Sequence, residues 1–452
     1  MNVDCKLSNE YAKKLYHQCV SNLPIIDYHN HLCIEDIISD RIFENITQIW
    51  ISVDPYKHRA MRILGVPEKY ITGEASDYEK FEKWYECLPR LAGNVLYDWS
   101  VMEFNKIFEI ELYPFKKKAE QVWTEVNEKL KKLSSKKILD KFNIEYCAPC
   151  ASLIDDIALF DKEKGICPSL RGDDIVGVNI DFIKKLGQLT DVDINTLSAF
   201  EDAVSKRLEV FIEKGCKYSD HALDDGFVYF ADDGQNEKRF QVVLCGEILS
   251  ERDERYLASE ILKRLAGLYA RNGLTLQLHI GARRSTSTHL RELAGPAGGY
   301  AAIGNCVNVK SLTEMLDDIE KTEYGIPKTL LFALNPADNA VMSILSGSYS
   351  KDGVEAIVSQ GPAWWWCDHY QGMWEMLDNL SVYGVMSTFV GMTTDSRSLL
   401  SFVRHDYFRR ILCQWMAEKV EKGVLPDNFD ILSDIVKRMC YYNAAKTIGI
   451  MQ

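Results

Sequence analysis

The triplet His29-Asn30-His31 is the part of the chain whose residue types and spacing point most directly to chemistry. It follows an apolar run at residues 23–27 (LPIID). In an extended strand, residues i and i+2 point to the same side, so the two imidazoles can face one ion. Two hydrogen-bonded structural histidines would also satisfy this pattern. Its position at the end of a strand favours a metal site, although imidazole alone does not select between zinc, manganese and iron.

Two later strand ends supply further candidate ligands. His279 closes the run 274–279 (LTLQLH), and Asp395 follows the run 385–392. Two or three histidines with one carboxylate and an open position are typical of a catalytic metal centre. The alternatives are a buried structural histidine and a helix N-cap formed by Asp395. The corresponding positions of the two residues on separate strands favour the metal interpretation.

Basic and aromatic residues near other strand ends could bind an acidic sugar. Arg171 and Arg397 lie just past the third and eighth runs, and a guanidinium can hold a carboxylate with two hydrogen bonds. An ordinary surface position is the alternative for each. Of the tryptophans at 364–366, we expect one to line the site and the others to pack in the core. The Cys147/Cys150 pair could be a redox pair or half of a zinc site, but no second CxxC motif accompanies it, and we interpret it as structural.

The elements that must position these residues are short apolar runs, most of them followed by helical patterns. The eight runs lie at residues 23–27, 144–147, 165–167, after 215, 274–279, 328–334, 354–358 and 385–392. Such repetition favours a closed parallel barrel, and barrel enzymes carry their chemistry at the C-terminal strand ends. The helix before the fifth run is expected to end at Gly273. The sequence thus predicts an α/β fold, a distorted (β/α)8 TIM barrel.

A different pattern separates the first two runs. Apolar residues at helical spacing, such as Phe81, Trp84 and Val122, stand among charged ones. We interpret residues 36–140 as a helical insertion after the first strand. Residues 1–35 are then an N-terminal helix with the first strand, and residues 141–452 the rest of the barrel. The insertion could place Tyr56 over the active site.

Composition narrows the class of protein. The chain has 452 residues, 13 cysteines and a formal net charge of -13. The charge argues against nucleic-acid and membrane partners, and the odd number of cysteines is typical of a reducing compartment. No run is long and apolar enough to span a membrane. We expect a cytoplasmic enzyme.

Several motifs in one order resemble the uronate isomerase (glucuronate isomerase) family of the amidohydrolase superfamily. They are residues 25–32 (IIDYHNHL), 48–50 (QIW), 56–57 (YK), 59–62 (RAMR), 219–221 (SDH), 277–282 (QLHIGA), 335–336 (NP), 338–339 (DN), 389–398 (FVGMTTDSRS) and 400–413 (LSFVRHDYFRRILC). The resemblance covers nearly the whole chain. It implies a distorted (β/α)8 barrel with a helical insertion, in agreement with the pattern of runs.

The resemblance also implies roles for single residues. His29 and His31 would bind one divalent metal ion, with His279 and Asp395 completing or flanking the site. Zinc is the first expectation for the ion, with manganese or iron as alternatives. The family's substrate and catalytic positions fall on Tyr56, Arg171, Trp364, Asp395 and Arg397, with His279 also expected to contact substrate. A small hexuronate substrate and a homo-oligomer are the expected partners.

The chain departs from the family in three places. Residues 148–152 (APCAS) stand where many relatives have Thr-Thr-Asp-Asp-Pro, and residues 169–173 (SLRGD) replace Ser-Trp-Arg-Pro-Asp. Ala297 replaces an acidic residue. The lost carboxylates leave the metal and arginine positions intact but affect the expectation for the exact substrate.

The implied reaction converts D-glucuronate to D-fructuronate and D-galacturonate to D-tagaturonate. Hydrogen moves between C2 and C1 through an enediol, so Asp395 could serve as the base, with Tyr56 orienting a substrate oxygen. Arg171 and Arg397 would steady the negative charge, and Trp364 would form a wall. The alternatives are a lactonase-like metal-dependent hydrolase and a lapsed paralogue that binds a sugar acid without turnover.

Overall fold

The centre of the molecule is a curled sheet of seven parallel strands in the order β1-β2-β3-β4-β5-β8-β9. The structure is a computed structural model that describes residues 4–296 and 298–451. The strands are β1 (Ile25–Asn30), β2 (Ile144–Ser152), β3 (Ser169–Arg171), β4 (Tyr218–Leu223), β5 (Thr275–Ile280), β8 (Thr329–Ala333) and β9 (Val358–Gln360). Strands β1, β5 and β8 are buried along their full length, as expected for strands covered on both faces. The predicted parallel α/β barrel class is confirmed, with a sheet that is not fully closed.

The predicted eighth strand is not formed. The 3-10 helix η7 (Met386–Thr388) and an extended segment take its place. This segment lies along β1, because the Asp395 amide donates to the His29 carbonyl (3.0 Å) and the His31 amide to that of Ser396 (2.8 Å). The His29 amide instead bonds to the Thr393 hydroxyl (3.0 Å), so a side chain interrupts the strand ladder. We call β1 together with residues 389–398 the seam.

Two other strands are displaced from their predicted positions. The third was predicted at residues 165–167 but forms at β3, where Ser169 pairs with Cys150; Ile166 makes only isolated bridges, to Cys147 and to Asp161. The seventh was predicted at residues 354–358, whereas β9 begins at the last of these residues and Val354 lies in a turn. In both cases the strand begins at or after the last residue of the predicted apolar run.

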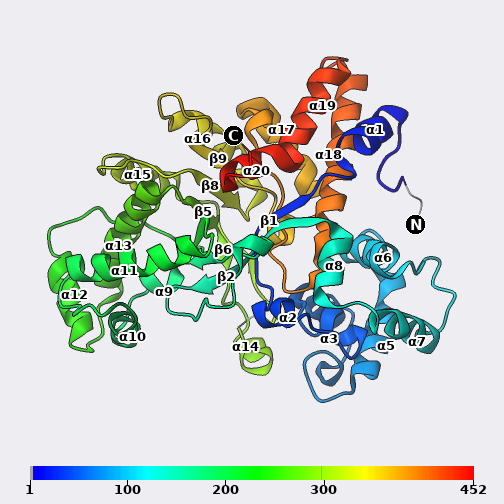
Figure 1. Ribbon diagram of the computed structural model, residues 1–452, viewed down its shortest axis with the longest axis horizontal. Coiled ribbons are helices and arrows are strands. Elements are labelled where there is room, and N and C mark those ends of the chain that lie inside the picture. The colour runs from blue at the N-terminus through cyan, green and yellow to red at the C-terminus, as the bar shows by residue number, and fades with distance from the viewer. Residues whose placement is uncertain (1–3, 297, 452) are drawn as a thin grey trace.

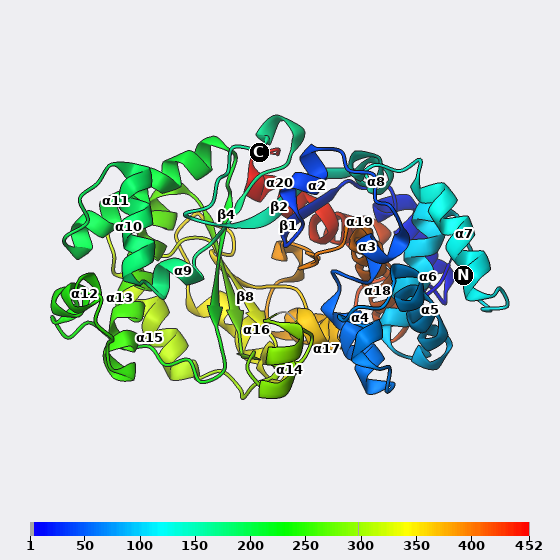
Figure 2. The same ribbon diagram turned by 90° about the horizontal axis from the view of Figure 1, so that it is seen from below.

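Helices pack around the strands, with α9 to α13 and α15 on one side and the helices between β1 and β2 on the other, where α18 and α19 also lie (Figures 1 and 2). The barrel and C-terminal helices are α9 (Asp173–Val176), α10 (Ile180–Thr190), α11 (Leu197–Glu213), α12 (Asn236–Leu244), α13 (Glu251–Asn272), α15 (Val309–Glu320), α16 (Asn339–Ser348), α17 (Tyr370–Tyr383), α18 (Val403–Glu421), α19 (Phe429–Lys437) and α20 (Asn443–Ile448). Helix α13 ends at a left-handed Gly273, as predicted. The N-terminal α1 (Glu10–Leu15) packs on α18.

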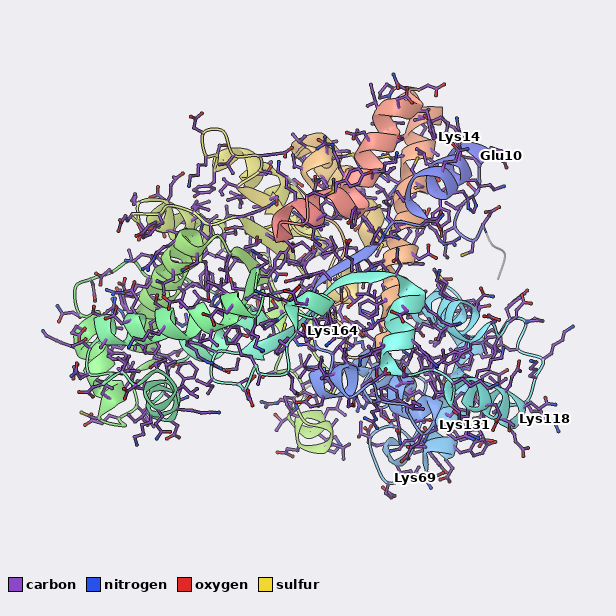
Figure 3. All side chains as sticks on the ribbon, viewed as in Figure 1. Glu10, Lys14, Lys69, Lys118, Lys131 and Lys164 are labelled. Carbon is purple, nitrogen blue, oxygen red and sulfur yellow. The ribbon has the colours of Figure 1, made fainter. Side chains whose placement is uncertain are left out.

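The segment between β1 and β2 is helical, as expected. Its helices are α2 (Ile34–Ile38), α3 (Ile46–Trp50), α4 (Pro55–Ile63), α5 (Asp77–Cys87), α6 (Val95–Phe108), α7 (Ala119–Leu130) and α8 (Ser135–Phe142). Phe81, Trp84 and Val122 are buried, while Lys118 and Lys131 point outward from the ribbon (Figure 3). The proposed boundaries near residues 35 and 140 stay a prediction. Within the described ranges, no helix is both long and apolar enough to cross a membrane.

A small antiparallel pair, β6 (Ala282–Arg283) with β7 (Ala302–Ile303), holds a loop that contains α14 (Thr288–Ala294). This loop approaches α4 closely at Gly299. A Cβ atom there would lie 2.2 Å from the Pro55 carbonyl oxygen, and the residue has a left-handed φ of 79°. Glycine therefore allows the loop to pack against the start of α4. The predicted departure at Ala297 lies outside the described residues.

Candidate active site

A cavity of about 410 Å³ lies at the C-terminal ends of the strands. All eight residues predicted for the site line it: His29, His31, Tyr56, Arg171, His279, Trp364, Asp395 and Arg397. The parallel sheet explains this convergence, because the C-terminal ends of its strands meet at one edge. The volume falls in the usual range for sites that bind small molecules.

The two histidines of the first motif clamp the carboxylate of Asp395. Asp395 Oδ1 lies 3.2 Å from His29 Nε2 and 3.0 Å from His31 Nε2. Asp395 has a left-handed backbone, with a φ of 47°, and the next helical turn is capped by Ser398 instead. Its predicted alternative role as an N-cap is therefore wrong, and its side chain is turned into the cavity.

Buried hydrogen bonds hold this part of the seam. Asp27 is fully buried and accepts bonds from the Thr393 hydroxyl (2.9 Å) and from the amide and hydroxyl of Thr394 (2.7 Å each). Asn30 also donates to it, and His405 Nε2 lies 3.2 Å away. Burial acts to raise the pKa of Asp27, but the hydrogen bonds from His405 and Thr394 hold it below its ordinary value. An ionised carboxylate thus ties β1 to the segment that carries Asp395.

Asp395 and the two histidines that contact it shift one another's pKa values. Burial acts to raise the pKa of Asp395, but hydrogen bonds from His29 and His31 hold it well below its ordinary value. Burial acts to lower the pKa of His29, while the charges of Cys150 and Asp220 and the bond to Asp395 raise it well above the usual range. Asp395 is therefore ionised near neutral pH and able to accept a proton.

Trp364 and His279 form one wall of the cavity. Trp364 Nε1 donates to Asp395 Oδ2 at 2.8 Å, and its ring lies 4.7 Å from the His279 ring. His279 is buried, and its Nε2 has no hydrogen-bond partner among the described residues. Burial and the charge of His29 hold the pKa of His279 well below its usual value, so the ring is neutral and one of its nitrogens has a free lone pair.

All three tryptophans of the run line the cavity, whereas we expected only one to do so. Trp365 has a left-handed backbone, with a φ of 54°, which is a strained conformation for a bulky residue. The rings of Trp364, Trp365 and Trp366 stack in succession, at centroid distances of 5.4 and 5.3 Å. A continuous aromatic wall results, suited to the apolar face of a sugar ring.

Tyr56 enters the cavity from α4, as the sequence predicted. Its ring packs edge-on against Trp366, and the guanidinium of Arg404 lies 5.1 Å from its centroid. The hydroxyl is buried and has no hydrogen-bond partner within the described part of the chain. Burial raises the pKa of Tyr56 well above its ordinary value, so the hydroxyl keeps its proton and can donate it in a hydrogen bond.

Three arginines line the cavity. Arg397 is exposed, and Arg171 is half-buried with its guanidinium 3.1 Å from the Asp173 carboxylate. The third, Arg284, was missed by the sequence analysis. It pairs with Asp224 at 2.9 Å and lies over the ring of Trp365. Its position just after β6, beside the fifth strand end, could have pointed to it.

A second face of His29 was also missed. Cys150 Sγ lies 3.5 Å from His29 Nδ1, and Asp220 Oδ1 lies 3.8 Å from the same nitrogen. The structural interpretation of the cysteine pair fits Cys147, which is buried beside Asn30, but it does not account for Cys150. Cys150 and Asp220 both belong to strands whose C-terminal ends face the cavity; the sequence analysis interpreted Cys150 as structural and named Asp220 only as part of the 219–221 motif, without a role.

The residues present fit a divalent metal ion. Two groups have ligand atoms within 4.8 Å of one another: His29, His31 and Cys150, and His29, Asp220 and His279. Asp395 belongs to neither group, and its contacts with His29 and His31, at 3.2 and 3.0 Å, are hydrogen-bond distances. His279 Nε2, which has no partner among the described residues, is a further available ligand atom.

Known proteins are similar to this chain in sequence and in fold. The family model described as glucuronate isomerase matches residues 1–448. A uronate isomerase of Caldicellulosiruptor bescii is 38% identical, with 99% of each chain covered. One from Bacillus pumilus is 37% identical, with 98% of this chain and 95% of the relative covered.

Solved structures agree with these relatives. The uronate isomerase of Thermotoga maritima superposes with a TM-score of 0.89 at 28% identity, with 98% of each chain covered. A putative metal-dependent hydrolase from Lactobacillus casei shares only the fold, with a TM-score of 0.52 at 12% identity over 95% of this chain and 96% of that one. The full-length matches support the isomerase expectation over the hydrolase alternative, and the chain belongs to the uronate isomerase (glucuronate isomerase) family of the amidohydrolase superfamily.

Proposed function

We propose that this chain interconverts the aldose and ketose forms of hexuronic acids, D-glucuronate with D-fructuronate and D-galacturonate with D-tagaturonate. The observation that carries the proposal is an ionised Asp395 in a cavity that also presents the Tyr56 hydroxyl and three arginines. A base, a hydrogen-bond donor and cationic anchors are the groups that isomerisation of an acidic sugar requires. Family membership supports the same reaction.

Asp395 would move the proton. In the aldose-to-ketose direction it takes the proton from C2 while the enediolate forms and returns it to C1, and the proton of the C2 hydroxyl passes to the C1 oxygen as the C2 carbonyl forms. One carboxylate serves both carbons, since they are adjacent. The hydrogen bond from Trp364 to Oδ2 holds the carboxylate during the transfer. The hydroxyl of Tyr56 would donate to a substrate oxygen on which charge develops.

Substrate recognition would fall to the arginines and the tryptophan wall. Arg397 and Arg171 would hold the sugar carboxylate and the enediolate, supported by Arg284. Trp364 would pack against the carbon skeleton, and His279 would contact substrate beside it. This arrangement uses local cations to bind an anion on a protein whose net charge is -13.

One divalent ion, zinc before manganese or iron, would be held by His29 and His31, with His279 and Asp395 completing or flanking the site. When bound, such an ion polarises a carbonyl oxygen as a Lewis acid. We further expect a cytoplasmic homo-oligomer, which sedimentation of the purified protein and fractionation of cells would test.

The decisive test is turnover of D-glucuronate and D-galacturonate, followed by formation of the keto acid. The purified protein should be verified for metal, with Asp395→Asn and wild type run in parallel. Turnover that disappears in the variant supports the proposal and the role of this carboxylate. Lactone hydrolysis without isomerisation would support a hydrolase instead. Saturable binding of both sugars with no turnover of either would identify a lapsed enzyme.

A further inference from the structure

The imidazole of His29 has a second face, on the side of β2 and β4. Its Nε2 is directed to Asp395, whereas its Nδ1 is directed to Cys150 and Asp220. All three distances within this second set are short. Cys150 Sγ lies 3.5 Å from His29 Nδ1 and 3.6 Å from Asp220 Oδ1. His29 Nδ1 and Asp220 Oδ1 are 3.8 Å apart.

We infer that Cys150 is a sulfur ligand of the metal ion, and that it forms one face of the coordination shell with His29 Nδ1 and Asp220. The inference rests on the metal centre of the proposed function and names its ligands. Zinc bonds of about 2.3 Å to sulfur and 2.0–2.1 Å to nitrogen predict an S···N edge of roughly 3.5–3.6 Å in a tetrahedron. The observed Cys150–His29 distance is 3.5 Å.

Other ligand atoms lie close enough to complete the shell. A ring nitrogen of His31 is within 4.8 Å of the ligand atoms of both His29 and Cys150. His279 stands in the same relation to His29 and Asp220, and its Nε2 is buried without a partner among the described residues. The Cys150 thiolate and the Asp220 carboxylate would together balance the charge of a divalent cation, so Asp395 is not needed as a ligand.

This placement leaves Asp395 free to act as the base. An imidazole that binds an ion through one nitrogen commonly donates its other N–H to a carboxylate, which fixes the ring. Here the His29 Nε2–H would donate to Asp395 while Nδ1 binds the ion. A single aspartate would otherwise have to serve as a tight ligand and as a proton acceptor. The sulfur ligand separates the two tasks.

A thiolate also changes which ion the site prefers. Soft sulfur ligands favour zinc or cobalt, whereas carboxylates suit manganese and magnesium. The position is one of those where the chain departs from the family pattern, since residues 148–152 read APCAS. We therefore expect this protein to select zinc over manganese more strongly than a protein with a carboxylate at position 150.

The test is the absorption spectrum of the full-length protein loaded with cobalt(II). Wild type should show an intense near-ultraviolet sulfur-to-cobalt charge-transfer band, and Cys150→Ser should lose it. Cys33→Ser is the matched control, because Cys33 is exposed and close to His31 in sequence but donates to Glu35; it should keep the band. A wild-type protein with stoichiometric cobalt and no such band overturns the inference without the need for any variant.

A competition experiment gives a second, independent measurement. The ratio of zinc to manganese affinity should fall about tenfold or more in both Cys150→Ser and Cys150→Asp. An unchanged ratio in two folded variants contradicts the sulfur ligand. The result is separable from the proposed function: isomerase turnover with no charge-transfer band refutes only the ligand, and a band without turnover refutes only the reaction.

Discussion

Two walls of the cavity meet at His29 and differ in how they are built. The seam is closely hydrogen-bonded, with Asp27 accepting several short bonds from Thr393, Thr394 and Asn30. On the wall of β2 and β4, the groups nearest His29 lie 3.5–3.8 Å apart. Both walls are buried and both carry a carboxylate directed to His29.

The difference indicates a division of labour. Short charge-assisted bonds fix a base in one orientation, which proton transfer between neighbouring carbons requires. The spacings at Cys150, 3.5 and 3.6 Å, suit weak thiol hydrogen bonds as well as the edge of a zinc site, and all the atoms there can donate electron pairs to an ion. Rigid and open walls on either side of one imidazole thus fit a proton-transfer side and a metal side.

Among substitutions that test the difference between the two walls, we expect the largest loss of activity at Asp395. Asp395→Asn should lower kcat by about 10³-fold, since a positioned general base contributes roughly 10²–10⁴-fold. Measurement of kcat at saturating substrate and metal checks this. Asp173→Asn is a control beside the open wall, because this carboxylate at the start of α9 accepts from the Ala222 amide of β4 and pairs with Arg171; the variant should lower kcat less than about tenfold. Equal losses in the two variants would show that the walls do not differ in this way.

The next effect concerns the stability of the seam. Asp27→Asn should lower the free energy of unfolding by about 3 kcal/mol, because the hydrogen bonds to a buried carboxylate are weakened or lost and buried His405 loses its carboxylate partner. Urea denaturation of the two proteins measures it. Asp224→Asn, a half-exposed carboxylate paired with Arg284, should change stability by less than about 1 kcal/mol.

Asp368, behind the seam, is expected to make the stability of the fold depend on pH. It is buried beside Arg404, which donates to the Thr394 carbonyl, and one of its carboxylate oxygens has no partner in the described structure. Burial raises the pKa of Asp368 to about 7. A carboxyl group with a raised pKa in the fold binds more protons there than in the unfolded chain, so stability falls as pH rises from about 4 to 7.

Asp368→Asn should remove this dependence. Relative to the variant, wild type should lose about 2 kcal/mol of unfolding free energy between pH 5 and pH 8, and little more above that. Urea denaturation at the two pH values provides the difference. A stability difference that is constant over this range contradicts the raised pKa.

The smallest effect is expected at Tyr56, which enters the cavity from α4. Tyr56→Phe removes a hydroxyl that has no hydrogen-bond partner among the described residues, so the fold should keep its stability while kcat falls roughly tenfold. Steady-state kinetics and thermal denaturation of the same samples separate the two. A loss of stability with unchanged kcat would make the hydroxyl structural.

Much of the site could be predicted from the sequence because it depends on local rules. The His29/His31 spacing places both imidazoles on one side of a strand. Apolar runs ending in polar residues identified five of the seven strands close to their observed positions. Since parallel strands share one C-terminal edge, His279 and Arg171 were expected at the same mouth and are found there.

Other features depended on contacts between residues far apart in the chain. The eighth barrel position is an extended segment and not a strand, because Thr393 and Asp27, 366 positions apart, take the bonds that a ladder would use. The third strand follows its apolar run because register is set by pairing with β2. Local apolar pattern carries no information on either.

The sequence by itself determined the parallel barrel, the helical segment after β1 and the residues gathered at the mouth, since periodicity and strand-end position are local properties. Only the tertiary structure decided which nitrogen of His29 faces Asp395 and which faces Cys150. Ring orientation is fixed by neighbours from β2, β4 and the seam together. No single stretch of the chain contains all of those neighbours, so their joint effect appears only when the barrel has formed.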